Sequence, residues 1–162
     1  MNFNSVEFIV FFPLVLLLGY LLPQKFRWIM LLIASYYFYI SWNFQLIYLI
    51  LFTTIVSYIA GLVMERSKNK AVRTATMTVT LVVCLGILFF YKYFDFLAVS
   101  VTDLLRAFSV PAKDFTLNLL LPVGISFYTF QTLSYVIDVY RGLPAEKHFG
   151  YYALFVSFFP QL

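Results

Sequence analysis

Charged side chains are scarce in this sequence, and that scarcity limits the class of protein. Only 11% of the 162 residues are Asp, Glu, Lys or Arg, whereas 63% are hydrophobic. Soluble globular chains carry about 25% charged residues, because a surface that faces water needs them. The composition therefore excludes an ordinary soluble domain and places the chain in lipid.

Cysteine and histidine each occur once. Cys84 lies inside the apolar run VTLVVCLGILFFY, where a lone thiol forms no internal disulfide and packs as an inert side chain. His148 follows Glu146 and Lys147 in a charged connecting segment, which disfavours a catalytic role. The sequence also lacks a phosphate loop, a Rossmann glycine pattern and a metal-ligand cluster, so we expect no bound cofactor and no metal.

Acidic residues are fewer than basic ones, and the formal net charge is +4. The basic residues are scattered between apolar runs, and the densest group lies in the short segment 65–73. Positive loops on the cytoplasmic side of a membrane account for this pattern. We therefore expect no nucleic-acid partner.

Long apolar runs fill most of the sequence, and each predicts a helix that crosses a bilayer, which takes about 20 residues. The expected helices cover residues 6–22, 28–42, 44–64, 77–97 and 117–140, and a sixth run covers residues 151–162. The sixth run is too short to span, which suggests that the chain is the N-terminal part of a longer domain. Residues 100–110 mix apolar and charged side chains, which predicts an amphipathic helix at the membrane surface. The predicted fold class is an all-α, polytopic membrane bundle.

The distribution of basic residues predicts an orientation. Lys25 and Arg27 follow the first run, and four basic residues follow the third run in segment 65–73. Two helices separate these loops, so both should lie in the cytoplasm, with the N-terminus outside. Residues 100–116 would then lie outside, and segment 141–148 inside.

The fifth expected helix carries more hydrogen-bonding groups than a lipid-facing helix needs. At 100° per residue, one arc of roughly 120° collects its polar side chains and a glycine. This polar stripe comprises Gly124, Tyr128, Gln131, Thr132, Tyr135 and Asp138. The opposite side holds the apolar residues Ile125, Phe130, Leu133, Val136 and Ile137.

Polar groups in hydrocarbon need partners, so the polar stripe should face protein or a water-filled cavity. Two interpretations are open. The stripe could supply hydrogen bonds between helices, or its side chains could line a substrate tunnel. The candidate tunnel residues are Tyr128, Gln131, Thr132, Tyr135 and Asp138. Asp138 also lies three residues before Arg141, a spacing that predicts an ion pair at the cytoplasmic end.

The segment LLLPVGISFYTFQTLSYVIDVYRG, followed by FGYYALFVSFFPQL, closely resembles the membrane-bound O-acyltransferase (MBOAT) family. Within that family it is most similar to the branch that O-acetylates alginate. The stretches MNFNSVEFIVFFPLVLLLGYLL and ASYYFYISWN resemble the N-terminus of that branch. The resemblance therefore covers nearly the whole chain in order.

This resemblance implies a bundle of helices around a tunnel, in the inner membrane of a bacterium. An acetyl or other acyl group, supplied by a donor substrate, would pass to a hydroxyl of an exported polysaccharide, with the help of periplasmic or extracellular partner proteins. A related branch moves D-alanine towards teichoic acids. From the residues alone, a transporter or a scaffold that recruits an enzyme stays an alternative.

The family's essential histidine lies in a later helix, beyond a block of the FFPQL type. The corresponding position falls past Leu162, and His148 does not match it. The resemblance therefore assigns no catalytic residue here, and it implies that the 162 residues alone are inactive.

Overall fold

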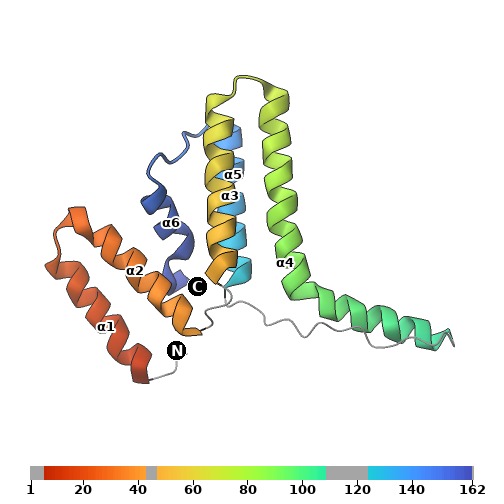
Figure 1. Ribbon diagram of the computed structural model, residues 1–162, viewed down its shortest axis with the longest axis horizontal. Helices are drawn as coiled ribbons and strands as arrows, with labels where there is room; N and C mark the ends of the chain where they lie inside the picture. The colour runs from red at the N-terminus through yellow and green to blue at the C-terminus, as the bar shows by residue number, and fades with distance from the viewer. Residues whose placement is uncertain (1–5, 43–46, 109–123, 162) are drawn as a thin grey trace.

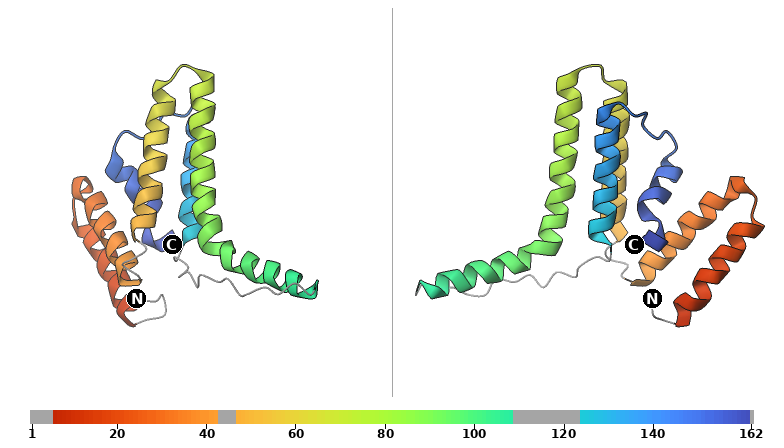
Figure 2. Two further views of the ribbon diagram at one scale, coloured as in Figure 1. Left: turned by 45° about the vertical axis from the view of Figure 1, so that its right-hand side comes forward. Right: turned by 180° about the vertical axis from the view of Figure 1, so that it is seen from behind.

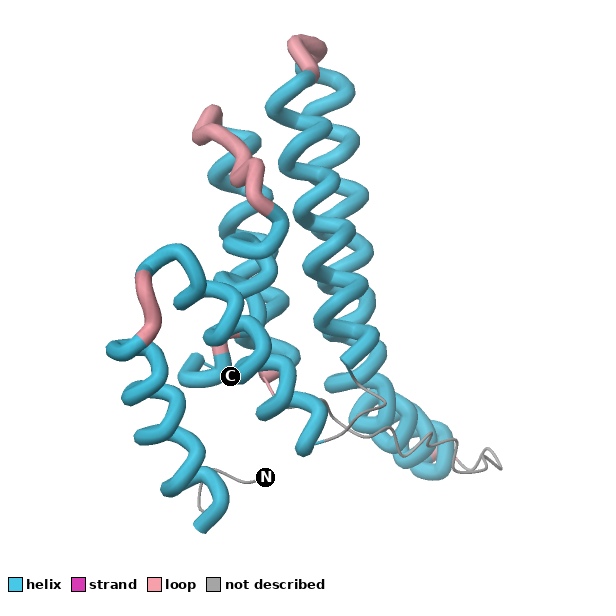
Figure 3. The backbone as a smooth tube through the Cα atoms, turned by 60° about the vertical axis from the view of Figure 1, so that its left-hand side comes forward, coloured by secondary structure: helices cyan, strands magenta, loops and turns pink. Residues whose placement is uncertain are grey.

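The computed structural model describes residues 6–42, 47–108 and 124–161. This part of the chain consists of helices and connecting loops only (Figure 3). The elements are α1 (Val6–Leu21), α2 (Gln24–Trp42), α3 (Ile47–Arg66), α4 (Lys70–Ala107), α5 (Ile125–Arg141), α6 (Phe149–Ser157) and the 3-10 helix η2 (Phe159–Gln161). The predicted all-α class is confirmed.

The centre of the molecule is a bundle of α3, α4 and α5, in which α5 packs against both of the others (Figures 1 and 2). Helix α6 packs beside α3 and α5. Helices α1 and α2 form a hairpin, and α2 joins it to the bundle by packing on α6. Among the described residues, α3 and most of α4 are long and apolar enough to cross a membrane, and α1 is a shorter apolar helix.

Helix α4 differs most from the sequence expectation, because it starts earlier and ends later than residues 77–97. It begins at Lys70, where the Asn69 side chain accepts a 2.9 Å hydrogen bond from the backbone N–H of Ala71. Such a cap satisfies one of the unpaired N–H groups of a helix start. The helix then continues to Ala107, since no proline interrupts it.

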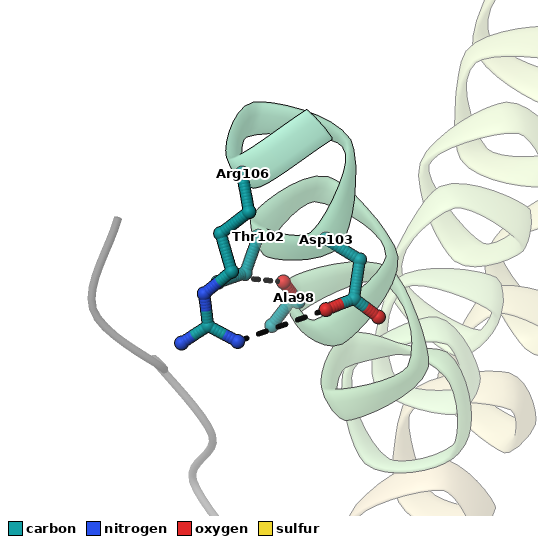
Figure 4. Close-up of polar contacts among 4 residues, drawn as sticks. All are labelled: Ala98, Thr102, Asp103 and Arg106. Atoms are coloured by element: carbon teal, nitrogen blue, oxygen red, sulfur yellow. Dashed lines mark hydrogen bonds and ion pairs between the residues drawn. The ribbon is translucent and has the colours of Figure 1, made fainter. Parts of the chain in front are cut away.

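The described part of the amphipathic helix expected over residues 100–110 is helical and is continuous with the rest of α4, and its place at the membrane surface stays a prediction. Figure 1 shows that α4 bends and that its last part runs away from the bundle. Two polar contacts in this part are local (Figure 4): Arg106 lies 3.8 Å from Asp103, and the Thr102 hydroxyl donates to the Ala98 carbonyl at 2.7 Å. Residues 109 and 110 lie outside the described part.

The other helix ends shift for local reasons. Helix α2 starts directly after Pro23, before the expected residue 28. Helix α5 is described from Ile125, after Gly124 in the left-handed conformation at φ 72°, and the expected residues 117–123 lie outside the described chain. Helix α6 starts at Phe149 and ends at Ser157, close to Pro160, which disfavours a helical residue before it.

Small hydroxyl side chains fill much of the contact between helices. Thr53, Thr54 and Ser57 of α3 are fully buried. Each donates to the carbonyl four residues earlier, at 3.0, 2.6 and 2.6 Å respectively. Because these hydroxyls are satisfied within their own helix, neighbouring helices can approach closely without an unpaired polar group.

Candidate functional site

The polar stripe of α5 turns towards protein along most of its length. Tyr128 and Thr132 are fully buried, and Gln131, Tyr135 and Asp138 are partly buried. Helices α3, α4 and α6 all pack on α5, so a polar side chain on this stripe meets another helix. The residues nominated for a tunnel thus lie in the interior or at its border, while their role as a tunnel wall stays a prediction.

The apolar side of α5 lies partly in the protein interior and partly at the surface. Ile125, Leu133 and Val136 are buried, whereas Phe130 is 61% exposed. The helix has neighbours on three flanks, so its apolar residues serve as core as well. Periodicity separates polar from apolar residues, but an apolar core and lipid favour the same side chains.

Towards the N-terminal end of α5, three buried hydroxyls lack a hydrogen bond of regular geometry in the described part of the chain. They belong to Tyr39 of α2 and to Tyr128 and Thr129 of α5. Tyr39 and Tyr128 lie in one apolar cluster and their hydroxyls interact with each other. A buried hydroxyl without a partner costs about 1–3 kcal/mol. Groups of this kind mark a place where a polar ligand can bind.

Beside this cluster, the polar contacts are more exposed. The hydroxyls of Tyr48 and Tyr91 lie 2.8 Å apart, and the Lys92 ammonium donates to the Ser126 hydroxyl at 3.0 Å. The bundle therefore offers hydroxyl and ammonium groups at the end where α5 begins. Sequence reasoning missed these partners, which lie on α3 and α4 rather than on the polar stripe.

The C-terminal half of α5 borders a second group of tyrosines. Tyr152 of α6 donates a 2.7 Å hydrogen bond to the Ser57 hydroxyl, and its ring centre lies 4.4 Å from that of Tyr135. The Tyr135 hydroxyl accepts from the backbone N–H of Glu146 at 3.2 Å. The short α5–α6 connection is thereby tied to the bundle interior.

A pocket of about 410 Å³ opens beside these tyrosines. Its lining residues are Tyr135, Pro144, Ala145, Glu146, Tyr151, Tyr152 and Phe155. Of the candidate tunnel residues, only Tyr135 lines it. The tyrosine pair in FGYYALF was the available sequence signal for this pocket.

The expected ion pair at the end of α5 has a clear outcome. Asp138 and Arg141 form no ion pair in the structure, and Arg141 is exposed in the last turn of α5. The α5 end is instead capped by Arg73, whose guanidinium donates to the carbonyls of Val139 and Tyr140 at 3.1 and 2.7 Å. A cation from another helix thus offsets the negative end of the helix dipole.

His148 occupies the N-cap position of α6, and it is exposed. Its ring centre lies 4.9 Å from that of Trp28 and 4.4 Å from that of Tyr151. Its backbone N–H donates to the Glu146 carboxylate at 2.9 Å. These contacts give His148 a packing role. In the described residues, no group of three His, Cys, Asp or Glu side chains could hold a metal.

Several known proteins are similar in sequence to this chain over its full length. The chain is 40% identical over 168 aligned residues to the probable alginate O-acetylase AlgI of Azotobacter vinelandii, and 39% identical to that of Pseudomonas aeruginosa; both alignments cover 100% of this chain. A peptidoglycan O-acetyltransferase of Helicobacter pylori is 29% identical over 99% of the chain. No protein-family model and no solved structure matches the sequence.

The chain is homologous to membrane O-acetyltransferases, and the MBOAT-like resemblance noted from the sequence is confirmed. In particular, it matches the N-terminal third of alginate O-acetylases of the AlgI type. It spans about a third of the length of these relatives, 33% for the Azotobacter protein and 32% for the Pseudomonas one. The homology and the two membrane-length apolar helices together indicate a membrane protein.

Proposed function

We propose that this chain belongs to a membrane-embedded O-acyltransferase that moves an acetyl group onto a hydroxyl of an exported, alginate-like polysaccharide. Homology to alginate O-acetylases supports the reaction class. The structural observation that carries the proposal is the group of buried hydroxyls of Tyr39, Tyr128 and Thr129, which have no hydrogen bond of regular geometry in the described part of the chain. An acyl donor or a sugar crossing this interior would meet hydroxyl groups whose hydrogen-bonding capacity the described residues leave largely unused.

The described residues suit a role in binding and orientation. When a sugar hydroxyl attacks an acetyl carbonyl, a base must take the hydroxyl proton and donors must stabilise the developing oxyanion. Tyrosine and threonine hydroxyls can donate to such an oxygen. Among the described residues, the buried polar side chains other than tyrosine are all serine or threonine and include no imidazole or carboxylate, so we propose that the base comes from elsewhere. The family resemblance implies a histidine beyond Leu162 for this step.

The acceptor has a second candidate. The relative from Helicobacter pylori carries the name peptidoglycan O-acetyltransferase, so a cell-wall glycan is an alternative polysaccharide for the same chemistry. The higher identity to the alginate O-acetylases favours an alginate-like acceptor. D-alanyl transfer, transport and scaffolding stay predictions that neither the structure nor the relatives favour.

The proposal is tested by removing the buried Tyr128 hydroxyl. In the complete product of the gene, we expect Tyr128→Phe to lower polysaccharide O-acetylation at least tenfold, while the amount of protein and its thermal midpoint stay unchanged or rise. Stability should not fall, because the hydroxyl has no regular hydrogen bond to lose. The measurement is the acetyl content of the exported polysaccharide, alongside membrane levels of the protein.

Tyr37→Phe is the matched control, since Tyr37 also lies on a helix but is 57% exposed. Gln131→Leu extends the test to the partly buried amide of the polar stripe. Acetylation at the unmodified rate in Tyr128→Phe would rule out this hydroxyl as part of the acyl-transfer path. Loss of stability without a specific loss of acetylation would favour the hydrogen-bonding interpretation of the stripe.

We propose further that the N-terminus lies outside the cell membrane and that the turn between α3 and α4 lies in the cytoplasm. Arg73 beside this turn binds the carbonyl of Tyr140, so the turn and the end of α5 lie at one end of the bundle. Partner proteins for the acyl transfer would act at the opposite, outer end, where α5 begins.

Cysteine labelling tests this orientation. With Cys84→Ala as background, we expect Phe108→Cys to react with a membrane-impermeant reagent in intact cells, because Phe108 is 73% exposed. Asn69→Cys, in the turn before α4, should react only after permeabilisation. The reverse pattern would show that the topology is inverted.

A further inference from the structure

A basic pocket lies at the end of the bundle where α4 begins. It has a volume of about 370 Å³ and is lined by Lys68, Lys70, Arg73 and Tyr140. None of these lining residues is acidic, and the first turn of α4 contains no Asp or Glu. Helix N-termini carry partial positive charge and favour anions. Three cations beside such a terminus repel one another, so an anion bound among them would be favoured.

The inner wall of this basic pocket is fixed by contacts between α4 and α5. The Arg73 guanidinium is held by two carbonyls of α5 and lies 5.9 Å from the centre of the Tyr140 ring. The Tyr140 hydroxyl in turn lies 3.1 Å from that of Thr74. Lys68 and Lys70 are exposed at the rim, so two mobile ammonium groups can close on a ligand that a fixed guanidinium has already attracted.

A second, apolar hollow continues from the basic pocket along α4. It is shallow and open to the surroundings, and it is lined by Lys70, Ala71, Thr74, Ala75, Thr78 and Val79. Lys70 therefore lines both spaces, and it is the only charged residue of the second. The small side chains leave a shallow groove on a face of α4 that the described helices do not cover; Val79 is 61% exposed.

The length of this groove matches one leaflet of a membrane. From Lys70 to Val79 a helix rises about 14 Å, and half of a bilayer's hydrocarbon core is about 15 Å. An anion held at Lys70 would therefore lie at headgroup level. The groove would then extend into the hydrocarbon for about the length of an acyl chain of the same leaflet. A free phosphate would use the basic pocket alone and would leave the groove without a function.

We propose that the basic pocket and the groove together bind one anionic phospholipid, with its phosphate among Lys68, Lys70 and Arg73 and an acyl chain along α4. The site is independent of the acyl-transfer path proposed above, because it lies where α5 ends, at Tyr140, whereas the buried Tyr128 lies near the start of α5. The bound lipid would neutralise the cations at the helix start and cover the small-residue face.

The test compares lipids of equal chain length on the purified protein in a non-ionic detergent. Native mass spectrometry should show that phosphatidylglycerol is retained in preference to phosphatidylcholine, and phosphatidylglycerol should raise the thermal midpoint more. Lys68→Gln with Lys70→Gln should weaken phosphatidylglycerol retention about 25-fold. This corresponds to about fivefold for each lysine removed, which is the usual strength of attraction between one basic residue and an anionic lipid surface. Lys25→Gln with Lys147→Gln, an equal charge change at exposed positions, should leave retention unchanged.

A groove-filling variant separates a lipid from a soluble phosphate. Ala75→Leu should reduce phosphatidylglycerol retention but not the weak binding of glycerol 1-phosphate. Equal retention of the two lipids would overturn the proposal. So would full retention in Ala75→Leu, or displacement of the lipid by equimolar glycerol 1-phosphate, because either result would mean that the groove holds no acyl chain. If another protein segment covers the groove on α4, the protein should show no preference between the two lipids, and that result would also overturn the proposal.

Discussion

Helices α3 and α4 are similarly apolar and adjacent in the chain, yet other helices bury much more of α3 than of α4. In the most apolar window of α3, 44% of residues are buried, against 17% for α4. The difference follows the small residues: Thr53, Thr54 and Ser57 of α3 are fully buried and Gly61 meets Tyr135. In lipid, hydropathy does not tell which face meets protein, whereas small and hydroxyl side chains do.

Helix α4 buries one narrow stripe. Thr80, Cys84 and Leu88, spaced four residues apart, are its buried positions within the bundle. The remaining faces are largely exposed, and the part beyond the bend leaves the bundle altogether (Figure 2). Substitutions should therefore have large effects on α3 and small ones on most of α4, and three comparisons test this contrast.

The largest effect is expected for glycine to alanine substitutions in the two helices. A methyl group at Gly61 would meet ring atoms of Tyr135 at 2.8 and 2.9 Å, whereas one at Gly86 would meet nothing within 4 Å. Tyr135 cannot move freely, because it packs on Tyr152 and binds the Glu146 N–H. Gly61→Ala should lower the free energy of unfolding by about 1–3 kcal/mol, the usual cost of overpacking.

Gly86→Ala supplies the matched control. It should be neutral or stabilising by up to about 1 kcal/mol, since alanine is the better helix former. Thermal or denaturant unfolding of both variants in one detergent measures the difference. Equal destabilisation of the two would contradict the close contact between α3 and α5.

A smaller effect is expected for the hydrogen bond between α6 and α3. Tyr152→Phe and Ser57→Ala each remove one partner of a buried 2.7 Å contact. A double-mutant cycle should give a coupling energy of about 0.6–1 kcal/mol, as found for hydrogen bonds between membrane helices. Tyr93→Phe on α4 should change stability by less, because Tyr93 is 44% exposed. A coupling energy of zero would mean that the two hydroxyls do not pair in the membrane.

The sequence predicted the apolar helices but not their neighbours. Apolar runs and the proline after Leu22 were enough to expect α1, α2 and α3, since length and composition decide such helices. The Ser57–Tyr152 pair joins residues 95 positions apart, and no local pattern reports a contact of that kind. The buried tyrosine of α2, Tyr39, was missed for the same reason.

Helix α4 was expected to end near residue 97, and the mixed apolar and charged segment after it was expected to form an amphipathic helix. A helix can continue through charged residues when they reach water or a partner. Lys92 does so by donating to Ser126. Proline, glycine and caps end helices more reliably than charge.

The smallest effect is expected at the far end of α4, where Arg106 and Asp103 approach within 3.8 Å. Both side chains are largely exposed, at 49% and 65%, so water screens their attraction and the pair should contribute less than about 0.5 kcal/mol. Asp103→Asn, which keeps the shape of the side chain and removes its charge, should leave the unfolding midpoint of the purified protein almost unchanged. The same variant measured at high salt should differ even less. A loss above about 1 kcal/mol would mean that this part of α4 packs against protein, and the contrast between α3 and α4 would then hold only for the bundle half of α4.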